Sequence, residues 1–128
     1  MLTQEKAFSS FAVDDIEAAR KFYGETLGIE VEEVPPHGLL GLKVGEGPGV
    51  MVYPKEDHEP AVFTVLNFPV ADVEAAVAEL EGRGVRFERY AGTPMETDET
   101  GVFRGGGPLI AWFKDPAGNT LSVIEVDR

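Results

Sequence analysis

The sequence predicts an α+β protein built from two tandem βαβββ modules. The first observation is a short repeat: FAVDDIEAA at residues 11–19 returns 57 residues later as FPVADVEAA at residues 68–76. A unit that occurs twice is typical of two copies of one supersecondary motif. The second observation is a change from alternating to helical spacing of apolar residues around each copy. We expect a first module at residues 1–54, a linker at 55–61 and a second module at 62–128, together forming one compact domain.

The first module begins with a strand at residues 6–13, in which Phe11 and Val13 share one face. Asp14 or Asp15 can cap a helix, whose apolar residues continue at helical spacing until Gly28 ends it. Three strands are expected after this helix, at residues 29–34, 39–44 and 50–53, with the turn GEGPG between the last two.

The second module repeats this order of elements. Its helix begins at Asp72 and ends at Gly82 and Gly84, and a long loop at residues 91–108 interrupts the later strands. Each module would present a curved sheet with its helix on the convex side, so the concave faces either cover each other or line a cleft. The expected strands of this module are residues 62–68, 85–90, 109–114 and 120–126.

Composition and charge exclude several classes of function. The chain of 128 residues has a net charge of −12, without the basic stripe that binds nucleic acid. An acidic surface could attract cationic small molecules, although solubility is the simpler explanation. We expect no contact with a membrane, because no apolar run approaches the roughly 18 residues of a membrane helix. The N-terminal MLTQEKAFSS is unlike a signal peptide and cysteine is absent, so a cytoplasmic protein is expected.

Three segments of the chain carry a resemblance: VDDIEAARKFYGETLGIEV, PVADVEAAVAELEGRGVRFE and WFKDPAGNTLSVIE. They resemble the vicinal oxygen chelate superfamily, which includes glyoxalase I, extradiol dioxygenases, fosfomycin-resistance transferases and bleomycin-resistance proteins. The resemblance covers residues 6–127 and implies the glyoxalase-like fold of paired βαβββ modules. It also implies a homodimer, because many relatives form one. Enzymes and passive binders share this fold, so the resemblance does not choose a reaction.

Metal-dependent members of this superfamily carry a histidine seven residues before each helix-start aspartate and a glutamate on the last strand of each module. The histidine positions are Phe8 and Val65 here. The glutamate positions are Ser122 and Val52, or Met51 if the hairpin alignment shifts by one residue. A divalent cation needs imidazole, carboxylate or thiolate ligands, which these residues do not supply. We therefore expect no metal and no cofactor.

Other residues with chemical potential have simpler explanations. His37 and His58 lie in predicted loops and are expected to be solvated rather than ligands or bases. The glycines at 105–107 could form an anion-binding nest after Arg104, but a flexible hinge is the simpler interpretation. The long loop containing Phe103 and Arg104 is a candidate lid. No nucleophile with a positioned base is visible, so catalytic residues remain unknown.

Strand alternation predicts which side chains line the concave faces. The face is mostly apolar, with Ser10, Asn67 and Ser122 as polar points, which suits a partly apolar small molecule. The alternative is that the apolar side chains fill the cavity. Trp112, which adds aromatic surface together with Tyr90, fits either the core or the cleft. The expected cleft residues are Phe8, Ser10, Val52, Val65, Asn67, Trp112 and Ser122.

Three functions are compatible with these observations. The first is a metal-independent, bleomycin-resistance-like protein that binds a small organic ligand, with a cationic ligand as one candidate. The second is an enzyme of the same superfamily, of lyase, transferase or dioxygenase type, with a non-standard or absent metal site. The third is a structural or regulatory module whose cleft is filled. Metal analysis and ligand-induced stabilisation distinguish the three.

Overall fold

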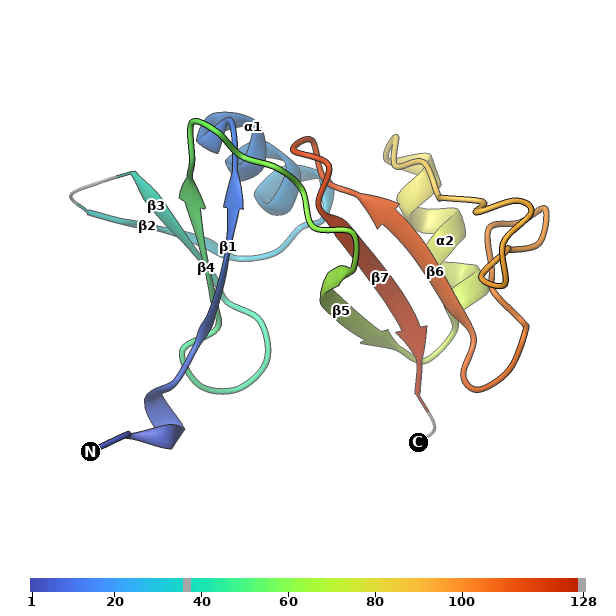
Figure 1. Ribbon diagram of the computed structural model, residues 1–128, viewed down its shortest axis with the longest axis horizontal. Helices are drawn as coiled ribbons and strands as arrows, with labels where there is room; N and C mark the ends of the chain where they lie inside the picture. The colour runs from blue at the N-terminus through green and yellow to red at the C-terminus, as the bar shows by residue number, and fades with distance from the viewer. Residues whose placement is uncertain (36–37, 127–128) are drawn as a thin grey trace. The chain divides into compact units, whose positions relative to one another are not determined.

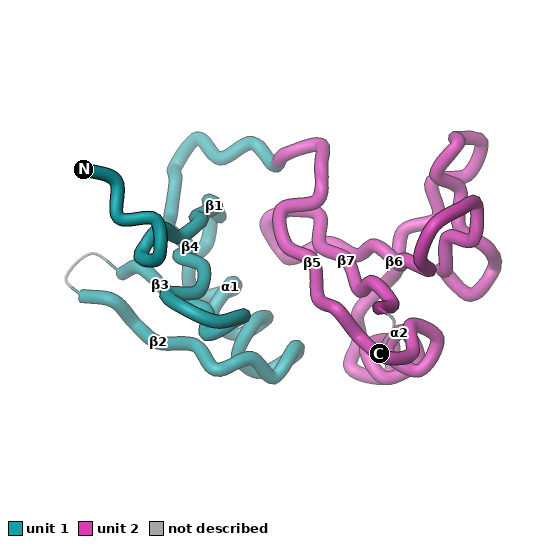
Figure 2. Tube along the Cα trace, turned by 90° about the horizontal axis from the view of Figure 1, so that it is seen from below, with its two compact units in different colours: residues 1–60 teal, residues 61–128 magenta. Residues whose placement is uncertain are grey.

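The computed structural model describes residues 1–35 and 38–126. It confirms the mixed α+β architecture, and the strands and helices follow the predicted succession except for the strand expected at residues 85–90 (Figure 1). The chain divides into two compact units, Met1–Pro60 and Ala61–Arg128 (Figure 2). Among the described residues, no helix is long and apolar enough to cross a membrane.

The first unit contains a four-stranded sheet and short helical segments. The neighbouring strands β1 and β4 run parallel, whereas the remaining neighbours are antiparallel. In spatial order the strands are β1 (Ser9–Val13), β4 (Val50–Pro54), β3 (Leu39–Leu42) and β2 (Val31–Val34). The helical segments are the 3₁₀ turn η1 (Gln4–Lys6), the α-helix α1 (Ile16–Lys21) and its π-helical continuation η2 (Phe22–Thr26).

The start and the end of the first helix follow from its sequence. Asp15 Oδ1 accepts hydrogen bonds from the backbone N–H groups of Glu17 and Ala18, both at 3.1 Å. These groups would otherwise have no partner in the first turn. Gly28 ends the helix with a φ of 73°, which costs a glycine little. The fully buried Tyr23 packs against Phe11 at 5.9 Å between ring centroids.

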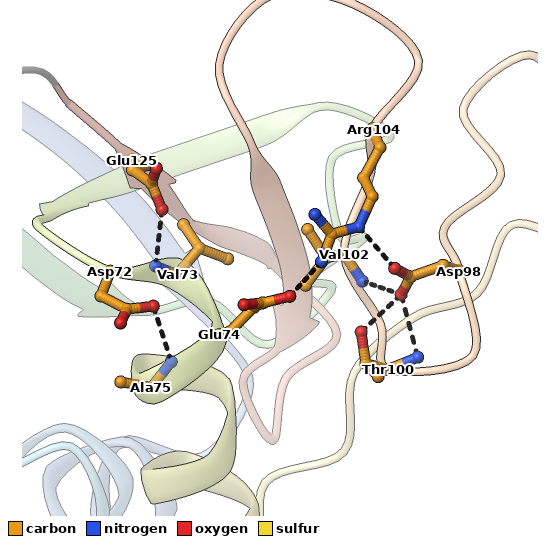
Figure 3. Close-up of polar contacts among 9 residues, drawn as sticks. All are labelled: Asp72, Val73, Glu74, Ala75, Asp98, Thr100, Val102, Arg104 and Glu125. Carbon is orange, nitrogen blue, oxygen red and sulfur yellow. Dashed lines mark hydrogen bonds and ion pairs between the residues drawn. The ribbon is translucent and has the colours of Figure 1, made fainter.

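The second unit contains a three-stranded sheet and the helix α2 (Val73–Gly82). Asp72 Oδ1 accepts a hydrogen bond from the Ala75 N–H at 3.1 Å, and Glu125 Oε1 accepts one from the Val73 N–H at 3.0 Å (Figure 3). Asp15 and Asp72 therefore cap equivalent helices, as the repeat predicts. In spatial order the strands are β5 (Thr64–Val70), β7 (Thr120–Glu125) and β6 (Ile110–Lys114).

Residues 85–90 do not form the strand that the sequence predicts. A single bridge joins Phe87 to Phe113. The hydroxyl of Thr97 donates to the carbonyl oxygens of Glu88 and Arg89, at 3.0 and 3.2 Å. These two carbonyl groups are therefore occupied and do not extend the hydrogen-bonded pairing of the sheet. The chain then turns away at Tyr90, whose φ is 48°. Residues 85–90 therefore lie beside β6 without forming a regular strand.

The turn between β6 and β7 holds the DPAGN sequence in a closed hydrogen-bonded loop. Asp115 Oδ1 accepts from the backbone N–H groups of Ala117 and Asn119, at 3.0 and 2.8 Å. Its Oδ2 accepts from Asn119 Nδ2 at 3.0 Å. Both Asp115 and Asn119 are buried, so these bonds satisfy polar groups that water does not reach. The turn fixes the register of the strands that carry Trp112 and Ser122.

Candidate ligand-binding site

Three of the predicted cleft residues come together on one face of the second unit's sheet. Ser122 on β7 pairs with Asn67 on β5 and with Trp112 on β6. Side chains at paired positions of adjacent strands lie on the same face. The alternate positions of β6 and β7 form the buried apolar face packed with α2. Those positions are Ala111, Phe113, Leu121 and Val123.

A hydrogen bond connects the two polar members of this face. Ser122 Oγ donates to Asn67 Oδ1 at 2.5 Å. The Ser122 side chain is fully buried, whereas Asn67 is exposed. The bond therefore satisfies a buried hydroxyl and ties β5 to β7 at the centre of the face.

A groove of about 370 Å³ lies on the same face, beside Trp112. This volume falls within the usual range for small-molecule sites. Trp112 is 6% exposed, so it belongs to the core and also contributes to the groove lining. Its ring lies 5.5 Å from Tyr90 and 5.7 Å from Phe103, between centroids. The groove is lined by Val62, Phe63, Thr64, Tyr90, Thr93, Met95, Trp112 and Thr120.

Tyr90 is held in an unusual backbone conformation at the wall of this groove. A φ of 48° is uncommon for a residue other than glycine, and such strain persists only where neighbours enforce it. Thr93 supplies this restraint, because its hydroxyl and its backbone N–H both donate to the Tyr90 carbonyl, at 2.7 and 3.2 Å. Burial raises the pKa of the Tyr90 hydroxyl and the charge of Glu88 adds to this, whereas a hydrogen bond with Thr120 opposes it. The phenol is therefore un-ionised at neutral pH.

The structure corrects the predicted position of Val65. The register of β5 against β7 shifts between Thr64 and Leu66, which marks a β-bulge at Val65. A bulge inserts one residue and changes which side chains reach a given face. Thr64 rather than Val65 pairs with Thr120 and lines the groove.

The first unit presents a smaller groove, of about 150 Å³, on the face that carries Ser10. Phe8 lines it and is 56% exposed. Ser10 pairs with Met51, which also lines the groove, so these residues share the face opposite the buried Phe11. The lining is Phe8, Glu32, Val34, Gly41, Lys43, Pro48, Val50 and Met51.

Val52 does not lie on that face. It is fully buried and pairs with Phe11 and Leu40, both of which are core residues. The alternative that the sequence left open, Met51, takes the position beside Ser10. The reason is strand parity, because a shift of one residue along β4 exchanges the two faces.

The candidate lid residues Phe103 and Arg104 have different surroundings. Phe103 forms a bridge with Ile110 and packs against Trp112, so it borders the ligand face. Arg104 instead pairs with Glu74 on α2 and donates from Nε to Asp98 Oδ2 at 2.7 Å (Figure 3). The segment is therefore fastened to the helix through an ionic cluster.

Asp98 is the centre of this cluster. Its Oδ1 accepts from the Thr100 N–H at 2.9 Å, the Thr100 hydroxyl at 2.6 Å and the Val102 N–H at 3.0 Å (Figure 3). Hydrogen bonds from Thr100 and then from Arg104 hold the pKa of this carboxyl far below its usual value. The carboxylate is thus ionised at any pH at which the protein is handled, and it fixes the chain before Phe103.

The residues at the superfamily's ligand positions do not fit a divalent cation. Phe8 and Val65 have no lone pair to offer, and the Ser122 hydroxyl is already bonded to Asn67. Over residues 1–35 and 38–126, no three His, Cys, Asp or Glu side chains gather into a group that could hold a metal. His58 lies in a loop, where its backbone N–H donates to the Lys55 carbonyl at 3.1 Å. His37 lies outside the described residues.

Sequence reasoning missed several groove residues. Thr64 was hidden by the bulge, and Met95 lies in a loop whose conformation no periodicity predicts. Tyr90 was visible as an aromatic residue, but its place in the groove depends on its left-handed backbone. The sequence signal that could have identified Tyr90 was an aromatic residue at the start of a long loop.

The fold and the groove together define a class: mixed α+β proteins built from two similar units, with a groove on the sheet face opposite the helix of the second unit. A model of the Glyoxalase/Bleomycin resistance protein/Dioxygenase superfamily matches residues 7–123. The chain therefore belongs to this superfamily. Among curated proteins, none matches the sequence.

Solved structures of the same fold include two from Streptomyces sp. CB03234. TnmS3, an antibiotic binding protein, is 26% identical, with a TM-score of 0.62 over 94% of this chain and 96% of that one. A glyoxalase/bleomycin resistance protein is also 26% identical, with a TM-score of 0.59 over 93% and 98%. The glyoxalase family protein from Enterococcus faecalis is 24% identical, with a TM-score of 0.66 over 98% and 100%, and shows the fold alone.

Proposed function

We propose that this protein is a metal-independent binder of a small organic molecule, which it holds on the helix-free face of its second unit. The observation that supports this most directly is the groove beside Trp112, which combines three aromatic rings, a methionine and threonine hydroxyls. A largely apolar concavity with a few polar groups is the usual form of a small-molecule site. Phe8, Ser10 and Met51 give the first unit a second, smaller surface for the same purpose.

The proposed independence from metal rests on the chemistry of the donor set. A mononuclear site needs several strong ligands at once. The hydroxyl of Ser122 is neutral and buried, and it already donates a hydrogen bond to Asn67. Neither Phe8 nor Val65 carries an imidazole, so a histidine ligand would require a substitution at each of these positions. Binding rather than metal-assisted chemistry is therefore the function that the residues support.

The nature of the ligand is suggested by one relative and by charge. TnmS3 is described as an antibiotic binding protein, and it spans nearly the same length as this chain. We therefore favour a natural product or a drug-like molecule. The net charge of −12 favours the approach of a cationic molecule over an anionic one. The partners we propose are thus a small molecule and, as in many relatives, a second copy of the chain.

A thermal-shift screen of the purified protein tests the proposal. A ligand that binds only the native state must raise the melting midpoint. At a free ligand concentration one hundred times Kd, it adds about 2.7 kcal/mol to the free energy of unfolding. Antibiotics of cationic glycopeptide and polycyclic aromatic types form the first panel. Metal analysis accompanies the screen, and stoichiometric metal removable by a chelator would contradict metal independence. If no compound shifts the midpoint at saturation, a filled face explains the structure better. Sedimentation velocity checks for the dimer.

A further inference from the structure

The lining of the Trp112 groove is free of formal charge. All eight of its residues are neutral at pH 7, including Tyr90, whose pKa burial raises further. This is unusual in a chain with 23 acidic and 11 basic residues. A charged ligand entering this groove would give up hydration and find no ionic partner among the lining residues, because the nearby charge of Glu88 belongs to a residue outside the lining. The local chemistry therefore differs from the overall negative charge of the protein.

The groove also offers hydrogen bonds at defined points. The Thr93 hydroxyl is engaged, because it donates to the Tyr90 carbonyl at 2.7 Å. Within the described part of the chain, Thr64 Oγ1 makes no hydrogen bond. Its hydroxyl can both donate and accept. Tyr90 can likewise accept or donate one further bond. A ligand with a hydroxyl or carbonyl substituent would find partners in these two groups.

The apolar surfaces favour a flat ring. Trp112 and Tyr90 meet edge to face at 62°, which presents aromatic surface to the groove from two directions. Met95 is 44% exposed at the rim, and its flexible thioether adapts to ring edges. The strained backbone of Tyr90 indicates that its ring is held in place before a ligand arrives.

We propose that this groove binds an uncharged, planar aromatic molecule that carries a hydroxyl or carbonyl group. The ring packs between Trp112, Tyr90 and Met95, and the polar substituent bonds to the hydroxyls of Thr64 and Tyr90. This inference rests on the proposed binding function and narrows it, because the local lining selects neutral ligands although the whole chain attracts cations.

Three probes with the same ring system isolate the effect of charge. At pH 7, 2-naphthol is neutral, 2-naphthoate is an anion and 2-(aminomethyl)naphthalene is a cation. Isothermal titration calorimetry measures each against the full chain. We expect 2-naphthol to bind with one-to-one stoichiometry and roughly tenfold more tightly than either charged probe, because the groove does not compensate a desolvated charge. A cation that binds as tightly as 2-naphthol would overturn the inference.

Variants locate the binding. Met95→Glu places a carboxylate at an exposed rim position, where folding is unaffected, and should weaken 2-naphthol binding roughly tenfold while favouring the cation. Leu2→Glu is the matched control, because Leu2 is 91% exposed and lies in the other unit. Trp112→Phe keeps the core filled and should also weaken binding. If Met95→Glu leaves 2-naphthol binding unchanged, the site lies elsewhere and the inference is wrong.

The result separates this inference from the proposed function. If none of the three probes binds but the antibiotic panel still raises the melting midpoint, the neutral-ring inference fails and the binding function stands. If neither the probes nor the panel has any effect, both fail. Tyr90→Phe adds a test of the polar contact, since it removes only the hydroxyl and should weaken 2-naphthol binding several-fold; an unchanged Kd would exclude Tyr90 from the contact.

Discussion

The hydrogen bonds of Asp98 should determine whether the segment before Phe103 stays closed. In Asp98→Ala, the Thr100 N–H, the Thr100 hydroxyl and the Val102 N–H lose their acceptor, and Arg104 loses one of its two carboxylates. Typical hydrogen bonds contribute about 0.5–1.5 kcal/mol each, and bonds to a charged group such as this carboxylate about 1.5–3 kcal/mol. Because the Asp98 side chain is 34% exposed, we discount the sum for solvent and expect a loss of about 2 kcal/mol.

Asp98→Asn is the matched variant. Its amide oxygen can keep the three bonds to Thr100 and Val102, and only the ion pair with Arg104 is lost. An exposed pair contributes less than about 1 kcal/mol. Amide hydrogen exchange at Val102 separates the two cases, because this residue is fully buried and its N–H donates to Asp98. We expect roughly thirtyfold faster exchange in the alanine variant and less than about fivefold in the asparagine variant.

Two results would refute this reasoning. Equal acceleration in both variants would show that the charge of Asp98, and not its acceptor geometry, holds the segment. Unchanged exchange in Asp98→Ala would show that the hydrogen bonds do not limit opening.

The pH dependence of the same segment has a definite sign. The pKa of Asp98 is lowered by the Thr100 hydroxyl and by Arg104 from its usual value of 3.8. Its stabilisation is therefore fully present above pH 3.8 and is lost as the pH falls through the lower, folded-state pKa. Exchange at Val102 should be insensitive to this carboxyl between pH 5 and 8.

Four further substitutions test the geometry of the site. Ser122→Ala should cost about 1 kcal/mol and lower the calorimetric midpoint by several degrees, through loss of the bond to Asn67; an unchanged midpoint would mean that the bond contributes nothing net. Val52→Ala should cost about 2 kcal/mol in urea denaturation and Met51→Ala less than about 1 kcal/mol, so equal losses would contradict the assigned parity. Gly105→Ala would place a Cβ 2.6 Å from the Phe103 ring, displacing it from Trp112 and changing the emission of the chain's single tryptophan. Unchanged emission would show that the loop absorbs the methyl group.

Local signals predicted most of the fold. Asp15 and Asp72 are good capping residues followed by apolar residues at helical spacing, and both cap helices in the structure. Alternation predicted that Asn67 on β5 and Ser122 on β7 share one face, whereas the sequence left the face of Trp112 open until the register of β6 against β7 placed it beside Ser122.

Tertiary interactions determined what the sequence did not predict. No glycine or proline at Val65 indicates the bulge in the sequence. Because of the bulge, Thr64 takes the place of Val65 on the ligand face. The strand expected at residues 85–90 failed because a threonine nine residues further on bonds to its carbonyl groups. Met95 reaches the groove only through this loop. Such contacts depend on residues that no local window contains.

The bulge in β5 also bears on aggregation. Within the second unit β5 is an edge strand, and its outer backbone groups are a potential template for a strand from another molecule. The bulge breaks the regular spacing of those groups near one end, and Pro69 removes an N–H donor near the other. A variant whose β5 lacks the bulge and carries Pro69→Val should therefore be more prone to edge-to-edge polymerisation, even if the folded second unit is equally stable.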